Sequence, residues 1–381
     1  MSKVYFTNMR CGRGTNLLKK LSKLLDAAGF DAINWDKRFA ALKLHFGEPG
    51  NLSALRPNWA KVVADKITAQ GGLPFLTDCS TMYVGRRSNA LDHIRAAWEN
   101  GYNYLACGCP IVMGDGLKGT DFAELPVPNG EIFKTAFIGR VIADADIIVS
   151  LNHFKGHQET GFGGALKNLG MGCASRAGKV ALHNEGKGII DKSCCTGCGY
   201  CAKNCAVDAI VFDEQGKAAI LHERCVGCGR CFGTCAFHAI YNENYSANER
   251  LCKKIAEYSG AVVAGKPHFH ISVAAQISPN CDCHNYNDAA IVPDVGIFAS
   301  FDPVALDHAC IDMVNTMPKI YEYAPEYKGK VTGAQLGYTP CGCGEGNDHF
   351  ALIHPGTDWR SQLEHGVKIG LGEMDYEVVE V

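Results

Sequence analysis

One stretch of the chain carries the same spacing of four cysteines twice, and this repeat constrains the fold more than any other feature. Each copy reads C-x2-C-x2-C-x3-C, and the copies begin thirty residues apart, at Cys195 and Cys225. The chain has 20 cysteines, and its first residues, MSKVYFTNMRCG, lack the apolar segment of a signal peptide. So many cysteines without a leader indicate a reducing cytoplasm, where they bind metal rather than form disulfides.

The spacing within each copy indicates the kind of metal centre. Bacterial ferredoxins hold two [4Fe–4S] clusters with such runs, and the fourth cysteine of each run ligates the other cluster. Structural zinc also binds paired C-x2-C units, but eight evenly spaced cysteines in two copies favour clusters. Oxygen attacks exposed clusters, so we expect an anaerobic host. The spacing assigns the first cluster to Cys195, Cys198, Cys201 and Cys235, and the second to Cys225, Cys228, Cys231 and Cys205.

The repeat interrupts a larger pattern of alternating strands and helices. Upstream, a strand at 4–7 precedes leucines at helical spacing that end at Gly29, and the apolar run 146–151 fits a buried parallel strand. Downstream, 268–277 reads as a strand, and Asp302 is a good helix N-cap. We therefore predict an α/β host domain with a mostly parallel sheet, interrupted by a ferredoxin-like α+β domain. The predicted boundaries are 1–187 and 245–381 for the host and 188–244 for the insert.

Composition excludes two classes of partner. A net charge of −3 gives no basis for nucleic-acid binding, which relies on clustered positive charge. No apolar run approaches the length that spans a membrane. Because 47% of the 381 residues are hydrophobic, the chain can bury a large core.

Outside the repeat, six cysteines form three C-x-C pairs. Thiolates two residues apart can chelate one metal ion when a loop turns both inward, so the pairs are candidates for a third metal centre or cluster. The alternative is that they are ordinary reduced thiols in loops. The pairs are Cys107 and Cys109, Cys281 and Cys283, and Cys341 and Cys343, and His284 directly follows the second pair.

The densest group of other polar residues is the segment 152–168, NHFKGHQETGFGGALKN, which follows the strand at 146–151. In α/β sheets, ligands bind beyond the carboxyl ends of strands. Histidines there could bind metal or transfer protons, although a single histidine is more often structural. The glycines could present backbone N–H groups to an anion at a helix N-terminus. The cofactor-binding candidates are Gly161, Gly163 and Gly164.

Several stretches resemble one protein family. The chain is similar to the cluster-containing branch of the domain-of-unknown-function 362 proteins, and the resemblance covers nearly all of it. It implies an iron–sulfur or ferredoxin-like protein, and it implies no particular reaction. Besides the cysteine repeat, the matching stretches are KLHFGEPGN (43–51), HFKGHQETGFGGALKNLGMG (153–172), SPNCDCH (278–284) and ASFDPVALDHA (299–309).

A weaker resemblance concerns the segment from His157 through GFGGALK to Lys167, which is similar to part of the nickel-pincer lactate racemases. There, a histidine at the position of His157 acts as acid and base, and a lysine at that of Lys167 carries the cofactor. A later histidine, matched by His183, ligates nickel. The family's further ligand histidine has no counterpart near Cys79. The resemblance therefore implies a shared fold and site location but gives the nickel cofactor little support.

Together, these features predict an iron–sulfur redox protein that passes low-potential electrons from two clusters to a site in the α/β domain. Such an oxidoreductase would need a redox partner protein, and a small anionic substrate would suit the lysines and glycines. A non-catalytic ferredoxin-like carrier and a metal or cofactor assembly protein are the alternatives. The predicted catalytic residues are His153, Lys155, His157, Lys167 and His183.

Overall fold

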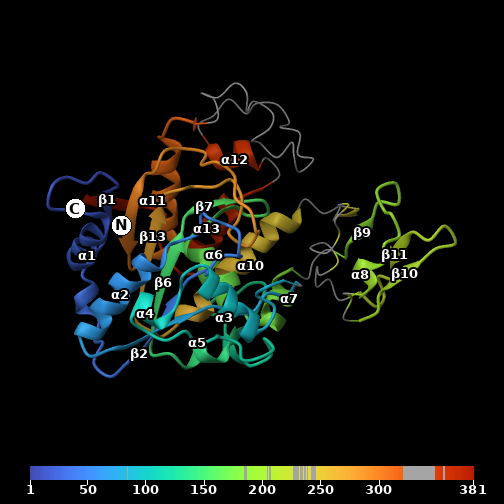
Figure 1. Cartoon of the computed structure of the whole chain (residues 1–381), viewed down its shortest axis with the longest axis horizontal. Helices are drawn as coiled ribbons and strands as arrows, with labels where there is room; N and C mark the ends of the chain where they lie inside the picture. Colours follow the sequence, from blue (N-terminus) through green and yellow to red (C-terminus); the bar gives the residue numbers. More distant parts are fainter. Residues whose placement is uncertain are drawn as a thin grey trace.

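A mixed, mostly parallel sheet of seven strands forms the centre of the molecule, as Figure 1 shows. Strand β14 is antiparallel to both neighbours, and every other neighbouring pair in the sheet is parallel. The predicted α/β fold with a mostly parallel sheet is therefore confirmed. In sheet order the strands are β15 (Tyr376–Glu380), β1 (Ser2–Asn8), β14 (Gly296–Ser300), β13 (His268–Ala274), β6 (Ile147–His153), β2 (Phe39–Lys43) and β3 (Leu73–Thr77).

The computed structural model describes most of the chain. The described residues are 1–83, 85–183, 187–203, 205, 207–225, 231, 235, 237, 239–241, 246–320, 348–354 and 357–381. Among them, no helix has both the length and the apolar character needed to cross a membrane.

Helices cover both faces of the sheet, and several small hairpins surround it. The helices are α1 (Leu17–Ala27), the 3-10 turn η1 (Phe30–Ala32), α2 (Pro57–Ala69), α3 (Ala90–Glu99), α4 (Tyr104–Cys107), α5 (Arg140–Asp144), α6 (Ala165–Cys173), α7 (Arg176–His183), α8 (Tyr200–Lys203), α10 (Ser246–Val263), α11 (Pro303–Asn315), α12 (His349–Ile353) and α13 (Arg360–Lys368). The antiparallel pairs are β4 (Phe122–Pro126) with β5 (Thr135–Gly139), β7 (Lys155–His157) with β8 (Gly161–Gly163), β9 (Ile189–Ile190) with β12 (Ile240–Tyr241), and β10 (Ile210–Phe212) with β11 (Ala218–Ile220).

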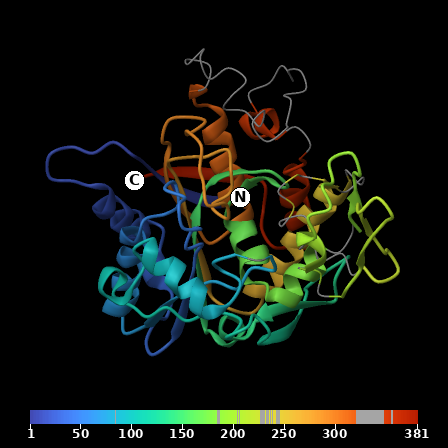
Figure 2. The ribbon, with the colours of Figure 1, turned by 45° about the vertical axis from the view of Figure 1, so that its right-hand side comes forward.

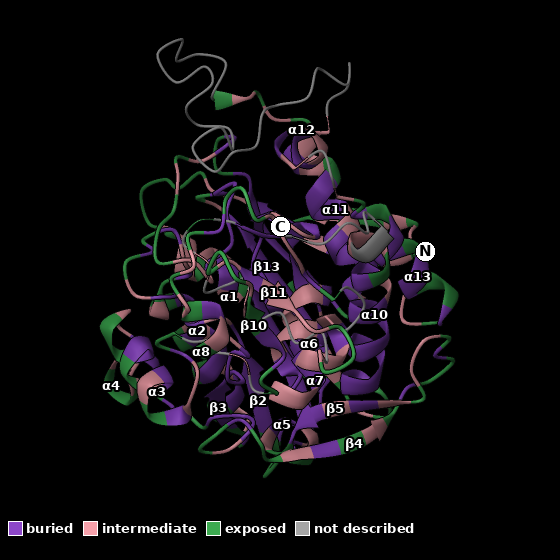
Figure 3. Cartoon of the chain, turned by 90° about the vertical axis from the view of Figure 1, so that its right-hand side faces the viewer, coloured by how far each residue is buried: buried purple, intermediate pink, exposed green. Residues whose placement is uncertain are grey.

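The alternation of side chains along the strands divides the core between the two faces. On β2, Leu42 packs toward α1 and α2, whereas Ala41 packs toward α10. On β6, Val149 packs on the same face as Leu42, and Ile148 packs on the same face as Ala41. Figures 1 and 2 show α1 and α2 on one side of the sheet and α6 and α10 on the other. The strands between these layers are buried in Figure 3, as expected for a sheet covered on both faces.

The observed elements explain how the chain reaches the site. All seven residues of β6 are buried, and this strand begins one residue after the start of the predicted run 146–151 and ends two residues after its end. Strand β13 ends at Ala274, before the predicted 277, because Gln276 takes a left-handed backbone with φ 51°. Asp302 caps α11 by accepting hydrogen bonds from two backbone N–H groups, as the sequence predicts.

The cysteine repeat lies in a small lobe at one side of the molecule (Figure 1). Strands β9 and β12 pair, with Ile240 opposite Ile190, so the two ends of this segment lie side by side. The lobe has its own core, formed by Cys195, Cys201, Ile210, Ala218, Ala239 and Ile240. The domain boundaries at 187/188 and 244/245 stay predictions.

Candidate functional site

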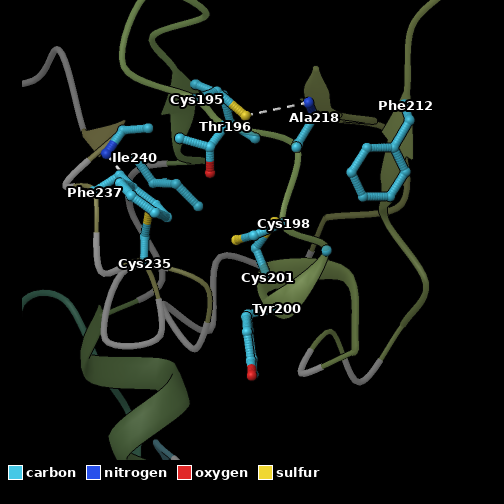
Figure 4. A pocket seen from close by; sticks show the side chains of 14 residues that line it. Cys195, Thr196, Cys198, Tyr200, Cys201, Phe212, Ala218, Cys235, Phe237 and Ile240 are labelled. Atoms are coloured by element: carbon cyan, nitrogen blue, oxygen red, sulfur yellow. Dashed lines mark hydrogen bonds between the residues drawn. The ribbon is translucent and has the colours of Figure 1, made fainter. Parts of the chain in front are cut away.

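A pocket in the small lobe is lined by cysteines from both copies of the repeat (Figure 4). Cys195, Cys198 and Cys201 come from the first copy and Cys235 from the second, and aromatic and aliphatic side chains complete the wall. The sulfur of Cys195 accepts a hydrogen bond from the backbone N–H of Ala218 at 3.4 Å. This pocket therefore collects the four residues that the spacing assigns to the first cluster.

The fourth cysteine of each copy has the same local geometry. Ala209 donates its backbone N–H to the sulfur of Cys205 at 3.2 Å, and Ala239 donates to Cys235 at 3.4 Å. Each donor lies four residues after its cysteine, so the two copies share this contact. Such N–H donors stabilise the negative charge of a metal-bound sulfur.

This pocket fits an iron–sulfur cluster. Its walls are apolar, its four thiols converge from two segments, and backbone N–H groups face two of the sulfurs, which are the surroundings that tune such clusters. The second predicted ligand set is described only in part. The structure describes Cys205, Cys225 and Cys231 as half-buried residues, and Cys228 lies outside the described residues.

A second site lies in the α/β domain, where the β7–β8 hairpin meets the loop that carries Cys281. The backbone N–H of Gly156 donates to the carbonyl oxygen of Ser278 at 2.8 Å. A Cβ atom at Gly156 would lie 2.3 Å from the carbonyl oxygen of Pro279, so only glycine allows this approach. The close contact fixes the loop against the hairpin.

Three donor atoms converge at this junction. The donor atoms of His157, Cys281 and Cys283 all lie within 4.8 Å of one another, close enough to hold a metal ion. Among the described residues, no other group of three or more His, Cys, Asp or Glu donors is this close. Cys281 is 2% exposed, so the junction is well shielded from water.

The sulfur of Cys281 is surrounded by hydrogen-bond donors. The ammonium group of Lys155 lies 3.2 Å away, and the backbone N–H of Cys283 lies 3.4 Å away. A hydrogen bond from the Cys283 thiol, with the charges of Lys155 and Lys167, holds the pKa of Cys281 well below its usual value, although burial opposes this. The same hydrogen bond raises the pKa of Cys283. The pair is therefore a thiolate at Cys281 beside a thiol at Cys283.

Lys155 remains charged in spite of its burial. Burial alone would lower the pKa of its ammonium group, but Cys281 and Asp282 outweigh this and raise the pKa to about 12. A Cβ atom at Gly163 would lie 2.8 Å from Nζ of Lys155, so the absence of a side chain there makes room for the ammonium group. Lys155 and Cys281 thus form a buried, mutually neutralising pair.

His157 faces this pair as a neutral ring. Its Nδ1 accepts hydrogen bonds from the backbone N–H groups of Glu159 and Thr160, at 3.1 and 3.2 Å. Burial and the charge of Lys167 lower the pKa of His157 to about 4, so the ring is neutral at pH 7. Because Nδ1 accepts, the proton is on Nε2, and the ring is the donor in its hydrogen bond with Cys281.

These charges bear on the predicted third metal. Two thiols and an imidazole are a suitable donor set for a soft divalent ion. However, Lys155 already compensates Cys281, and Lys167 adds a second positive charge nearby. His157 offers an N–H rather than a lone pair. The surroundings therefore fit a free thiolate better than a bound cation.

Two predicted site histidines are held by other protein groups. Nδ1 of His153 contacts both carboxylate oxygens of Asp282, at 2.9 and 3.0 Å, and its Nε2 donates to the carbonyl oxygen of Ala275 at 2.9 Å. The charge of His153 lowers the pKa of Asp282 against the effect of burial. His284 stacks on Tyr286. In this arrangement His153 and His284 hold the Cys281 loop and do not join the cysteine pair.

Lys167 and His183 lie at the more open side of the site. Both are half-buried, and Lys167 lies on α6 while His183 ends α7. Their electrostatic partner is Glu159: burial opposes its ionisation, but His183 and Lys167 lower its pKa. Four of the five predicted catalytic residues thus lie around Cys281 and Glu159: Lys155, His157, Lys167 and His183. The fifth, His153, contacts Asp282 instead.

The glycine run does not leave the α6 N-terminus open to an external anion. Asp307 accepts hydrogen bonds there from the backbone N–H groups of Ala165 and Leu166, at 2.7 and 2.9 Å. A Cβ atom at Gly164 would lie 2.2 Å from the Asp307 carboxylate, which explains this glycine. Gly161 has φ +75° and closes the turn between β7 and β8. The group that accepts these N–H hydrogen bonds is therefore the chain's own Asp307 side chain.

The other C-x-C pairs are separate from this site. Cys107 and Cys109 lie in the core beneath α1 and α2, 0% and 2% exposed. Burial raises the pKa of both thiols, to about 12 for Cys109. Cys341 and Cys343 lie outside the described residues.

Arg87 is a residue that the sequence did not single out. It is buried, its Nε donates to Glu48 at 2.6 Å, and its Nη2 donates to the carbonyl oxygen of Cys283 at 3.4 Å. Burial and the charge of Arg87 lower the pKa of His45 to about 3. The KLHFGEPGN stretch thus supports the Cys281 loop through Arg87. The only sequence signal was the presence of Glu48 in that stretch.

The fold and the two sites define a cysteine-rich α/β protein with a group of one His and two Cys donors that are close enough together to hold a metal ion. The chain belongs to the family described as Domain of unknown function (DUF362), whose model matches residues 40–312. No curated protein matches the chain.

Two solved structures show a distant likeness. One, from Thermotoga maritima, is 12% identical with a TM-score of 0.35 and covers 77% of this chain and 57% of its own. The other, the lactate racemase apoprotein from Thermoanaerobacterium thermosaccharolyticum, is 13% identical with a TM-score of 0.30 and covers 72% of this chain and 50% of its own. The chain thus spans about half the length of either protein. So slight a likeness carries no argument about the reaction.

Proposed function

We propose that the protein is an iron–sulfur redox protein in which two [4Fe–4S] clusters pass electrons to the Cys281 site. What supports the first cluster is the pocket lined by Cys195, Cys198, Cys201 and Cys235. Cys235 belongs to the other copy of the repeat, and this exchange of the fourth ligand is a property of two-cluster ferredoxins. Paired zinc sites of the C-x2-C kind would not require it.

The Cys281 site is suited to receive electrons. Lys155 and Lys167 stabilise the negative charge that reduction creates at this site, because the low-dielectric interior strengthens their attraction for it. His157 carries an N–H on Nε2 that can donate a hydrogen bond to a negatively charged reduced product. In this proposal the protein is an oxidoreductase whose small anionic substrate approaches from the side of Lys167.

A non-catalytic electron carrier is the second candidate. The burial of the site favours it: Cys281, Lys155 and His157 are each exposed by 6% or less, which leaves a substrate little access to their atoms. A carrier would exchange electrons with its partner through the cysteine-rich lobe alone. Replacing Lys167 by Met separates the two, because a carrier would still reduce its partner at the normal rate.

Cluster content tests the proposal directly. Protein purified without oxygen should contain about eight iron atoms and eight sulfides, and should show a [4Fe–4S] signal in low-temperature EPR after reduction. The Cys198→Ser variant should lose the first cluster, with about half of the iron. Cys194→Ser is the matched control, because Cys194 is also exposed and lies in the same loop but is not an assigned ligand. Zinc in place of iron, or equal losses in both variants, would refute the proposal.

A further inference from the structure

The Cys281 and Cys283 sulfurs are close enough to bond to each other. They lie within 4.8 Å, and a disulfide requires about 2 Å, so rotation about the side-chain bonds has to close about 3 Å at most. The loop that carries both cysteines is fixed from two sides. Gly156 binds it through Ser278, and Arg87 binds the carbonyl oxygen of Cys283.

The groups around Cys281 stabilise one particular product of breaking a Cys281–Cys283 disulfide, a thiolate at Cys281. Reduction of a disulfide leaves two sulfurs, and at Cys281 the ammonium group of Lys155 and the N–H groups of His157 and Cys283 are in place for a thiolate. A buried thiolate without such donors would be costly. Here the donors face one sulfur of the pair only, so the reduced state is a thiolate at Cys281 and a thiol at Cys283.

We infer that Cys281 and Cys283 are a redox-active pair that cycles between a disulfide and a dithiol and stores two electrons in the α/β domain. The inference rests on the proposed function for its source of electrons. The two electrons would come from the two clusters that the cysteine repeat would hold, one from each. The two electrons break the sulfur–sulfur bond, one proton from solvent binds the sulfur of Cys283, and the sulfur of Cys281 remains a thiolate.

The chain contains its own control. Cys107 and Cys109 have the same spacing and are both buried, whereas Cys283 is half-buried, and they lie in a core of aliphatic and aromatic side chains. No ammonium group is hydrogen-bonded to either sulfur among the described contacts, whereas Lys155 contacts Cys281 at 3.2 Å. We therefore expect this pair to remain reduced under conditions that oxidise Cys281 and Cys283.

The experiment is peptide mapping of thiols after mild oxidation. Protein purified without oxygen is treated with diamide, alkylated in denaturant and digested. The peptide containing Cys281 and Cys283 should be unalkylated and two hydrogen atoms lighter, and should be alkylated twice after reduction with dithionite. The peptide containing Cys107 and Cys109 should be alkylated twice in both samples. Two free thiols at Cys281 and Cys283 after diamide, or a metal ion bound there in one equivalent, would overturn the inference.

Electron counting links the pair to the clusters. Coulometric reduction of the oxidised protein should take two electrons more than reduction of Cys283→Ser, which keeps every assigned cluster ligand. Lys155→Met keeps both sulfurs but removes the charge-assisted hydrogen bond, so its equilibrium should shift toward the disulfide by about tenfold. An unchanged equilibrium in Lys155→Met would contradict the role given to the lysine.

The two proposals fail in distinguishable ways. A disulfide that forms with diamide in protein without iron would leave the cysteine pair standing and refute the cluster proposal. Clusters with normal EPR signals, together with equal electron counts for the wild type and Cys283→Ser, would refute the pair and leave the clusters standing.

Discussion

The contact between Asp307 and the start of α6 predicts a measurable coupling between two distant positions in the sequence. Asp307 is fully buried and accepts hydrogen bonds from two backbone N–H groups. Gly164 has no side chain, and a Cβ atom there would lie 2.2 Å from the carboxyl group of Asp307. Replacing Asp307 by Ala leaves both N–H groups buried without a partner. At about 1–3 kcal/mol for each N–H group, the free energy of unfolding should fall by about 2–6 kcal/mol.

The Gly164→Ala variant should be destabilised for a different reason. Its Cβ forces the carboxylate of Asp307 or the helix to move, and such overpacking costs about 1–3 kcal/mol. In the Asp307→Ala background the obstructing oxygen is gone, so the same substitution should cost little. The double-mutant cycle should therefore give a coupling free energy of about 1–3 kcal/mol, with the double variant more stable than additivity predicts.

Urea unfolding under argon, followed by far-ultraviolet circular dichroism, measures all four proteins of this cycle. Gly12→Ala is the control, because a Cβ at Gly12 would meet no atom within 4 Å. Equal costs of Gly164→Ala in the two backgrounds would refute the contact. A cost below about 0.5 kcal/mol for Asp307→Ala would show that the N–H groups find other partners.

Two further predictions concern the same region. Burial raises the pKa of Asp307 to about 7, above its unfolded value of 3.8, so its contribution to stability is present at low pH and is lost as the pH rises through 7. Between about pH 7.5 and pH 5 the wild type should gain about 2–3 kcal/mol relative to Asp307→Asn in urea unfolding, and parallel pH profiles would contradict this. Gly156→Ala puts a Cβ against the carbonyl oxygen of Pro279, so it should displace the Cys281 loop and lower the yield of the disulfide, whereas Gly12→Ala should leave that yield unchanged.

Local patterns in the sequence predicted the local parts of this structure. The apolar run before Asn152 is a buried strand, and Asp302 caps a helix, because such signals depend on neighbours within a few residues. The assignment of Cys235 to the first set of cysteines also came from spacing alone. The pocket now contains that cysteine together with three from the first copy.

The parts that could not be predicted depend on contacts between distant segments. The partner of His153 is Asp282, and the hydrogen-bond acceptor at the start of α6 is Asp307; each pair is separated by more than a hundred residues. No periodicity or spacing reports such a contact. The three C-x-C pairs also have identical spacing. The sequence alone therefore could not show that Cys107 lies in an apolar core and that Cys281 lies beside a lysine.

The glycine run led us to expect an external anion at the start of α6. A side chain of the protein itself occupies that place. Glycines near lysines indicate that the backbone and a positive charge closely approach another group, with no room for a side chain between them. Here Gly163 makes room for the ammonium group of Lys155, and Gly164 for the carboxylate of Asp307. The lysine is then neutralised by the sulfur of Cys281. Because that sulfur is negative only when it is reduced, the charge left for any anionic ligand at Lys155 depends on the oxidation state of the cysteine pair.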